Sequence, residues 1–179
     1  NIGTLNINGG GTRFMTSANI TNNGTLDWQD GRLDFTGGNS ILTNNATIII
    51  SGNNTTAFNG ARLTLTNNGI ITKTGTGTSN VTGILLFSNA GTLNCNGGNF
   101  IFGDANAGGT FTSLSGGTVI LNNGDFTSGP TTTFNNNSGA SIKGNGVFNF
   151  TSLFNSNAII APGSSPGLLT INGQQPLSA

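Results

Sequence analysis

Asn22-Asn23-Gly24-Thr25-Leu26 is the clearest copy of a five-residue phrase, N-x-G-T-L, that occurs eight times along the 179-residue chain. The third residues of successive copies are separated by 21, 22, 23, 22, 26, 23 and 18 residues. The fifth residue is aliphatic in every copy, and the first is Asn in five copies and Ser in three. A period of this length indicates a repeat architecture. The eight copies are Asn1–Leu5, Asn22–Leu26, Asn44–Ile48, Asn67–Ile71, Asn89–Leu93, Ser115–Val119, Ser138–Ile142 and Ser156–Ile160.

Each copy has the alternation of a β-strand. In the second copy, Leu26 and Trp28 fall on one face and Thr25 and Asp27 on the other, because side chains alternate along a strand. Most copies are followed by a second strand of the form G/A-x-Φ-x-Φ, and a less regular apolar spot precedes the next copy. The second strands are Gly31–Phe35, Ala61–Leu65, Gly83–Phe87, Gly98–Phe102, Gly146–Phe150 and Gly167–Ile171, with Gly124–Ser128 as a partial copy. The third spots are Ile41-Leu42, Phe58, Val81, Phe111, Phe134 and Leu153-Phe154.

Two or three short strands per turn of about 22 residues predict an all-β fold, a parallel β-helix of about eight rungs. Rungs stack at ~4.8 Å, so eight of them give a rod roughly 35–40 Å long. Long, irregular rungs favour the right-handed form. We therefore expect a single β-helical repeat domain over residues 1–179. Because the chain opens inside a repeat unit at Asn1, we expect it to be a segment of a longer chain.

The column of Asn and Ser at the first position predicts a ladder of side-chain amides, each bonded to the rungs above and below. The alternative is that these residues are turn residues facing water. We favour the ladder, because solvation alone would not keep Asn or Ser in all eight copies.

The composition is rich in polar residues, with 30 Gly and 30 Asn, and no window has the apolar stripe of a helix. Such compositions are often disordered, but 34% of the residues are hydrophobic, 12 of them Phe, and they fall in register. Five basic residues balance five Asp, which leaves no basic patch for nucleic acid. No apolar stretch approaches the ~20 residues of a membrane span. We expect no nucleic-acid partner and no membrane insertion by this segment.

Catalytic groups are scarce, since the chain has no His, Glu or Tyr. Asp27, Asp30 and Asp34 would suggest a glycosidase or a calcium site only if their carboxylates faced one cleft. Asp27 and Asp34 are expected on two different strands, with Asp30-Gly31 as the turn between them, so we interpret all three as solvated surface groups near Arg32. We predict no enzyme activity, no catalytic or metal-binding residues and no cofactor.

Two further residues bear on chemistry. Lys73 is the one charged residue in the longer connections Ser51–Gly60 and Thr72–Gly83, which disfavours a catalytic groove there. Cys95 aligns with the inward-facing Ile7, Trp28, Ile50 and Leu121, and we interpret it as a buried small hydrophobe.

The fourth position of the phrase forms a Thr column, and a flat Thr array on such a rod could order water or ice. This column is one residue wide and is broken by Ile70 and Ile159, so ice binding is not favoured on it. Its hydroxyl members are Thr4, Thr25, Thr47, Thr92, Thr118 and Ser141.

The segment Ala161–Gly173, Ala-Pro-Gly-Ser-Ser-Pro-Gly-Leu-Leu-Thr-Ile-Asn-Gly, resembles the A-P-G-x-S-P-G-x-L-T-I-x-G phrase of large bacterial surface proteins. Those proteins carry Asn/Gly/Thr-rich β-helical repeats and are similar to autotransporter passengers and to the giant adhesins of gliding Bacteroidota. The resemblance implies an extracellular, stalk-like or adhesive segment of the bacterial cell surface without enzymatic activity.

We therefore predict a structural or adhesive module of a surface protein or fibre. The alternative is a carbohydrate-active or carbohydrate-binding β-helix, such as a polysaccharide lyase or hydrolase or a phage spike. The expected partners are other copies or neighbouring repeats, stacked end to end, and glycans or surfaces. The sequence identifies no binding residues.

Overall fold

The chain is a rod of stacked β-strands in the computed structural model, which describes residues 1–36, 38–53, 58–60, 63–81, 83–103, 108–150, 154–163 and 167–173. These residues form 22 strands and no helix, and every strand pairing is parallel. No segment of this described part is therefore a helix long and apolar enough to cross a membrane. Ala61, Arg62, Asp104, Leu153 and residues 164–166 of the C-terminal phrase lie outside the described residues.

The strands make three faces of the rod. Face A contains β1 (Thr4–Ile7), β4 (Thr25–Trp28), β7 (Thr47–Ile50), β10 (Ile70–Lys73), β13 (Thr92–Cys95), β16 (Thr118–Asn122), the first part of β19 (Ser141–Asn149) and β21 (Ile159–Pro162). Face B contains β2 (Thr12–Thr16), β5 (Arg32–Thr36), β8 (Phe58–Gly60), β11 (Thr78–Val81), β14 (Asn99–Phe102), β17 (Asp125–Ser128), the last part of β19 and β22 (Leu169–Asn172). Face C contains β3 (Asn19–Asn22), β6 (Ser40–Asn44), β9 (Leu63–Asn67), β12 (Ile84–Asn89), β15 (Gly109–Ser113), β18 (Thr132–Asn136) and β20 (Phe154–Ser156).

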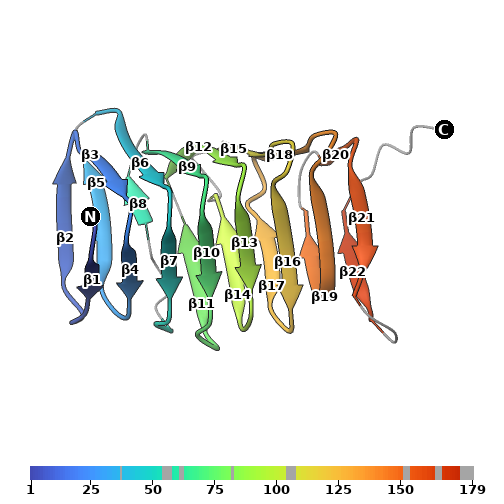
Figure 1. The fold of residues 1–179 in the computed structure, drawn as a ribbon, viewed down its shortest axis with the longest axis horizontal. Helices are drawn as coiled ribbons and strands as arrows, with labels where there is room; N and C mark the ends of the chain where they lie inside the picture. Colours follow the sequence, from blue (N-terminus) through green and yellow to red (C-terminus); the bar gives the residue numbers. More distant parts are fainter. Residues whose placement is uncertain are drawn as a thin grey trace.

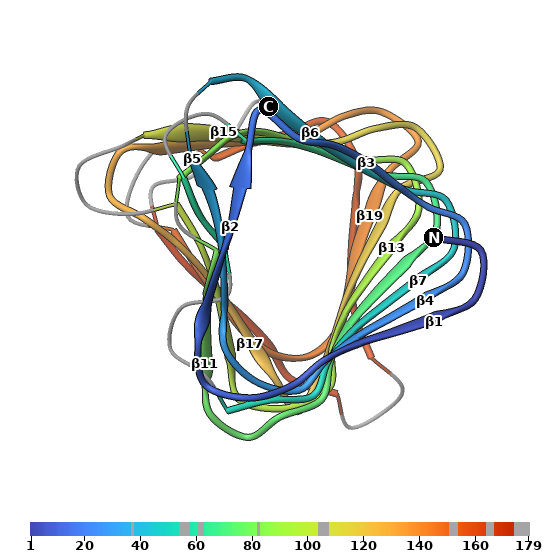
Figure 2. The ribbon, with the colours of Figure 1, turned by 90° about the vertical axis from the view of Figure 1, so that its left-hand side faces the viewer.

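The predicted parallel β-helix is confirmed. Seven rungs have a described strand on every face, and the eighth, β21 and β22, has strands on faces A and B, so the complete rungs are slightly fewer than the eight expected. Figure 2 views the rod from the end where β1 lies, and the chain turns clockwise as it recedes from the viewer. The helix is therefore right-handed, as expected.

The eight copies of the phrase stack on face A in the predicted register. Their fifth residues form one inward column, in which each is the strand partner of the next: Leu5, Leu26, Ile48, Ile71, Leu93, Val119, Ile142 and Ile160. The six inner members are buried, while Leu5 and Ile160 at the two ends are partly exposed. The aliphatic residue is required in every copy because this column is the wall of the core.

Two of the predicted second strands lie on a different face from the others. Ala61–Leu65 and Gly83–Phe87 overlap β9 and β12 of face C, whereas the corresponding segments of the other rungs lie on face B. In these two rungs, face B is formed by the short strands that contain Phe58 and Val81. The grouping of all the second strands into one set was therefore wrong. Faces B and C both require inward apolar residues with a period of two, so this pattern does not tell one face from the other.

The core changes character along the rod. The first rungs are filled mainly by aliphatic residues, with Trp28 and Phe35. The later rungs contain two Phe columns that face each other, Phe87, Phe111 and Phe134 on face C and Phe100, Phe126 and Phe148 on face B. Within the columns, the ring centroids are 4.5 Å apart for Phe111 and Phe134 and 5.0 Å apart for Phe126 and Phe148. Phe126 and Phe134 meet edge to face at 5.8 Å. Both arrangements are favourable aromatic geometries.

The predicted amide ladder exists at the corner between faces C and A. Each Asn Nδ2 donates to the Asn Oδ1 of the next rung. The distances are 2.9 Å from Asn1 to Asn22, 2.8 Å from Asn22 to Asn44, 2.8 Å from Asn44 to Asn67 and 2.7 Å from Asn67 to Asn89. Each Nδ2 also donates to a backbone carbonyl that follows the corner, for example from Asn67 to Thr92 at 3.2 Å. From Asn22 to Asn89 the ladder residues are fully buried, so they are not turn residues facing water.

In rungs six and seven the ladder residues are not the predicted Ser115 and Ser138. The strand partners in the column are Asn89, Ser113, Asn136 and Ser156. Two extra residues separate Ser113 and Asn136 from the next strand of face A and form a turn, closed by Gly117 N to Leu114 O at 2.8 Å in rung six. Because Ser113 is shorter than Asn, its Oγ has no hydrogen-bond partner, and the chain of amide bonds is interrupted there.

Replacing Ile71 by Asp tests the inward column. The carboxylate would be buried in an apolar column, where an ion pair with the buried Lys73 ammonium would not offset the cost of its desolvation, so the free energy of unfolding should fall by several kcal/mol. Ile70 is 44% exposed and Ile71 is 2% exposed, so Ile70→Asp is the matched control and should cost no more than about 1 kcal/mol. Urea unfolding followed by circular dichroism measures both. Equal losses for the two variants would contradict the assigned register.

Replacing Asn67 by Ala tests the ladder. The substitution leaves the Asn44 amide and the Asn89 and Thr92 oxygens without their buried partner, so we expect a loss of about 2–4 kcal/mol in the free energy of unfolding. The control is Asn68→Ala, because Asn68 is exposed and its Nδ2 donates to Asn45 Oδ1 at 2.9 Å, where water can replace it. A loss below about 0.5 kcal/mol for Asn67→Ala would exclude a stabilising ladder.

Candidate functional site

The three carboxylates singled out in the sequence do not share a cleft. Asp27 lies on β4 of face A and accepts hydrogen bonds from Gln29 Nε2 at 2.7 Å and Ser51 Oγ at 2.9 Å. Asp30 lies at the corner, where its Oδ1 accepts from Gly31 N at 2.8 Å. Asp34 lies on β5 of face B. The prediction of two strands separated by an Asp30-Gly31 turn is confirmed.

Asp34 differs from the expectation that all three are solvated. It is buried, and its Oδ2 accepts an ion-pair hydrogen bond from Arg32 Nη2 at 2.8 Å. Arg32 and Asp34 are two residues apart on one strand, so their side chains share the outer surface of face B. The strand partner of Asp34 is Phe14 of β2. This carboxylate therefore pairs with Arg32 and does not face Asp27.

Lys73 is also placed differently from the prediction. It belongs to β10 rather than to a surface connection, and it faces the core between its strand partners Ile50 and Cys95. Its side chain is fully buried, and Nζ donates a hydrogen bond to the carbonyl oxygen of Gly75. The signal was present in the sequence, because Lys73 follows Ile71 by two residues and so falls on the inward side.

Cys95 is the buried free thiol that the alignment predicted. Burial raises the pKa of Cys95 to about 12, with a smaller contribution from Asp125 and an opposing one from Lys73. Burial lowers the pKa of Lys73 below its ordinary value of 10.5, and Cys95 opposes this. A protonated thiol sealed in the core is a poor nucleophile, so this pair is not a reactive centre.

The Lys73 ammonium should destabilise the fold at neutral pH. Because its folded pKa is lowered, the unfolded chain binds more protons between that lowered pKa and 10.5, and stability should rise with pH through this window. Cys95 acts in the opposite sense between about pH 9 and 12, where only the unfolded thiol ionises.

Replacing Lys73 by Met should therefore raise the free energy of unfolding at pH 7 by about 1–3 kcal/mol and remove the Lys73 contribution to the rise with pH. The matched control is Lys143→Met, since Lys143 is exposed on the outer side of face A. Thermal melts from pH 7 to 10 measure both effects. A Lys73→Met variant that melts below the parent would show that the buried ammonium stabilises the rod.

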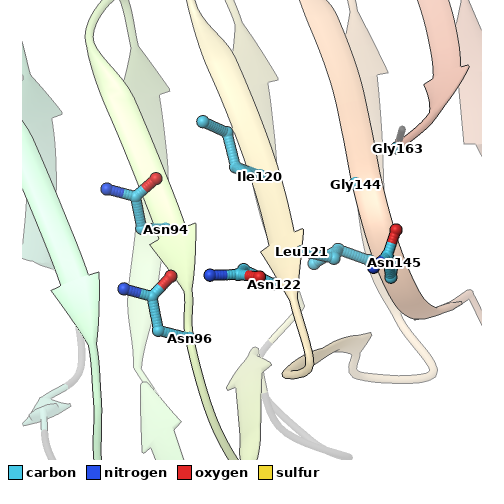
Figure 3. Close-up of a pocket in the computed structure, with 8 residues that line it drawn as sticks. All are labelled: Asn94, Asn96, Ile120, Leu121, Asn122, Gly144, Asn145 and Gly163. Atoms are coloured by element: carbon cyan, nitrogen blue, oxygen red, sulfur yellow. The ribbon is translucent and has the colours of Figure 1, made fainter. Parts of the chain in front are cut away.

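A groove lies at the corner between faces A and B. It holds about 460 Å³ and is lined by Asn94, Asn96, Ile120, Leu121, Asn122, Gly144, Asn145 and Gly163. Figure 3 shows the Asn side chains along three successive rungs: Asn94 lies on β13 and Asn96 follows it, Asn122 ends β16, and Asn145 lies within β19. Asn122 and Asn145 are strand partners in adjacent rungs. The groove therefore presents a row of amides along the rod axis.

The groove lies where the chain departs from the repeat at Gly144. In the preceding rungs the strand position of Gly144 is occupied by Lys73, Cys95 and Leu121, all of which are fully buried. Gly144 has φ +110°, and a Cβ there would lie 2.0 Å from the Leu121 carbonyl oxygen, so only Gly fits. At Gly163 a Cβ would lie 2.4 Å from Asn145 Oδ1, a side-chain atom that can move away, so this position is less restricted than Gly144.

The lining can hydrogen-bond but cannot transfer protons. Asn94 Nδ2 donates to Thr72 Oγ1 at 3.4 Å, whereas the side-chain amides of Asn96, Asn122 and Asn145 bond to no other part of the described chain. An amide offers two donors and one carbonyl acceptor and does not titrate. With the partly exposed Ile120 beside these amides, the groove suits a neutral ligand with many hydroxyl groups. Sequence reasoning missed it, because its members are joined only by stacking of successive rungs.

The described residues contain no group of three or more His, Cys, Asp or Glu side chains that could hold a metal ion. No protein-family model, no curated protein and no solved structure matches this chain.

Proposed function

We propose that the chain is a non-catalytic structural and adhesive module of an extracellular bacterial surface protein or fibre. The observation that supports this most is the unbroken parallel register of face A from β1 to β21, which makes an elongated body in which each rung is held by its neighbours. The resemblance of Ala161–Gly173 to surface adhesins points the same way. A groove lined by amides, without carboxylate, amine or thiol, supports binding rather than turnover.

The proposed partners of the rod are neighbouring repeats or further copies, stacked end to end. β1 and β2 pair on one side only, and the first rung exposes Ile2 and Leu5. The last described rung exposes Ile159 and Leu168. Unpaired strand edges with exposed apolar residues are surfaces that another strand covers. Because the two ends differ, such a contact does not close and builds a filament.

Stacking predicts concentration-dependent filaments of this chain, seen by electron microscopy and light scattering. Leu5→Lys places a charge on the open end and should reduce filament mass at least tenfold. Ile70→Lys is the matched control, since Ile70 is exposed midway along face A, and it should leave filaments unchanged. A parent that stays monomeric at high concentration would exclude stacking between copies and leave only covalent continuation.

Carbohydrate binding is the second candidate function, and the free amides of Asn96, Asn122 and Asn145 favour it. Such amides match the hydroxyl groups of a neutral glycan, each of which can donate and accept. Binding at this groove would also give the adhesive module a ligand class.

A glycan array probed with the labelled chain tests this. We expect neutral glycans to bind and Asn122→Ala to weaken binding at least tenfold, with Asn45→Ala, an exposed Asn at a different corner, as control. A reducing-sugar assay on the bound glycans should stay at background. Release of sugar would instead support the carbohydrate-active alternative. If no neutral glycan on the array bound the chain, carbohydrate binding at the groove would be contradicted.

A further inference from the structure

The outer surface of face C carries two parallel columns of side chains. The strand pairings place Asn19, Ile41, Thr64, Leu86, Thr110 and Thr133 in one column and Thr21, Thr43, Thr66, Ser88, Thr112 and Asn135 in the other. The second column has a hydroxyl in five consecutive rungs. In two rungs, with Thr64 and Thr66 and with Thr110 and Thr112, both columns carry Thr. This array is two residues wide, unlike the Thr column of face A.

The array is held in a fixed geometry. The residues between its two columns, such as Leu65, Phe87 and Phe111, are buried in the core and fix the backbone of each strand. Thr is stiff about χ1 because it is branched at Cβ. In the end view of Figure 2 the strands of face C run nearly one behind the other, whereas those of face A fan out. Face C is therefore the flatter of these two surfaces.

The hydroxyl groups of face C are free to bind water. Those of Thr43, Thr66, Ser88, Thr64 and Thr110 have no hydrogen-bond partner within the described part of the chain. On face A, by contrast, Thr118 Oγ1 and Ser141 Oγ bond to each other at 3.1 Å. None of the twelve residues in the two columns is charged, so none holds the tight hydration shell of an ion.

The spacing of the columns matches that of ordered water. Successive rungs are ~4.8 Å apart. In tetrahedral water, hydrogen bonds of about 2.75 Å place second-neighbour oxygens about 4.5 Å apart. A hydroxyl can both donate and accept, as a water molecule does. Ile41 and Leu86 interrupt the hydroxyls of the first column, so the continuous hydroxyl row is the second column, and the Thr methyl groups add apolar surface beside it.

We propose that face C binds ice, with the two columns replacing water molecules of the ice surface. An ice surface is uncharged, flat and periodic in two dimensions, and these are the properties that distinguish face C from the groove and from the ends of the rod. The site is separate from the groove on faces A and B, so the proposal stands apart from the module's structural and glycan-binding roles.

Ice adsorption of the fluorescently labelled chain tests the proposal, together with the growth rate and shape of single ice crystals in its presence. We expect the parent to coat ice and to slow its growth, and Thr66→Lys to reduce adsorption at least tenfold. Thr92→Lys makes the same change in the outward column of face A and should retain adsorption. Circular dichroism melts check that each variant is folded.

Exclusion of the parent from growing ice would overturn the proposal. Equal loss of adsorption in folded Thr66→Lys and Thr92→Lys would also overturn it, because face C would then have no special role. Adsorption to crystalline cellulose or chitin but not to ice would assign the face to a polysaccharide surface and equally reject ice. Any of these outcomes leaves the filament and glycan-array tests of the proposed function unaffected.

Discussion

In rungs two to four, a buried Asn at the corner between faces C and A donates one hydrogen bond to the rung ahead and another to the strand that follows the corner. Both partners must be in register for the amide to make both hydrogen bonds. A buried amide without its partners lowers the free energy of unfolding by about as much as a lost core contact does. A slip of one residue would also turn each inward column to solvent. The ladder and the apolar columns therefore specify the same alignment.

This alignment determines what the outer surface presents. Every position repeats along the rod, so residues about 22 apart in sequence become neighbours at one strand spacing. The amides of Asn96, Asn122 and Asn145 become a row in this way, and the hydroxyls of face C become two columns. The groove coincides with a departure from the repeat, since Gly144 stands where the earlier rungs have a buried side chain.

The fold class, the ladder and the Ile71 column were predictable, because each depends on one recurring phrase whose spacing is visible in the chain. The hand of the helix does not follow from that phrase, since rungs of this length only favour the right-handed form. The ladder residues Ser113 and Asn136 were not predictable. The corner that follows each of them has two extra residues, so counting back from the aliphatic residue of the phrase leads to Ser115 and Ser138 instead. The faces of β9 and β12 were missed because faces B and C require the same alternation. Lys73 was predictable from its register with Ile50 and Cys95, but its charge suggested a surface position. The groove lies at the corner between faces A and B and the hydroxyl array lies on face C, and the residues of both stand outside the phrase.

Hydrogen exchange of Asn side-chain amides, followed by nuclear magnetic resonance, tests the ladder most directly. Asn44 and Asn67 are buried and bonded on both sides, whereas Asn45 and Asn68 are exposed and adjacent to them in sequence. The account predicts that the Nδ2 protons of Asn44 and Asn67 exchange at least a hundredfold more slowly than those of Asn45 and Asn68. Equal, fast exchange of all four would show that the amides face water and that no buried ladder sets the register of the rod.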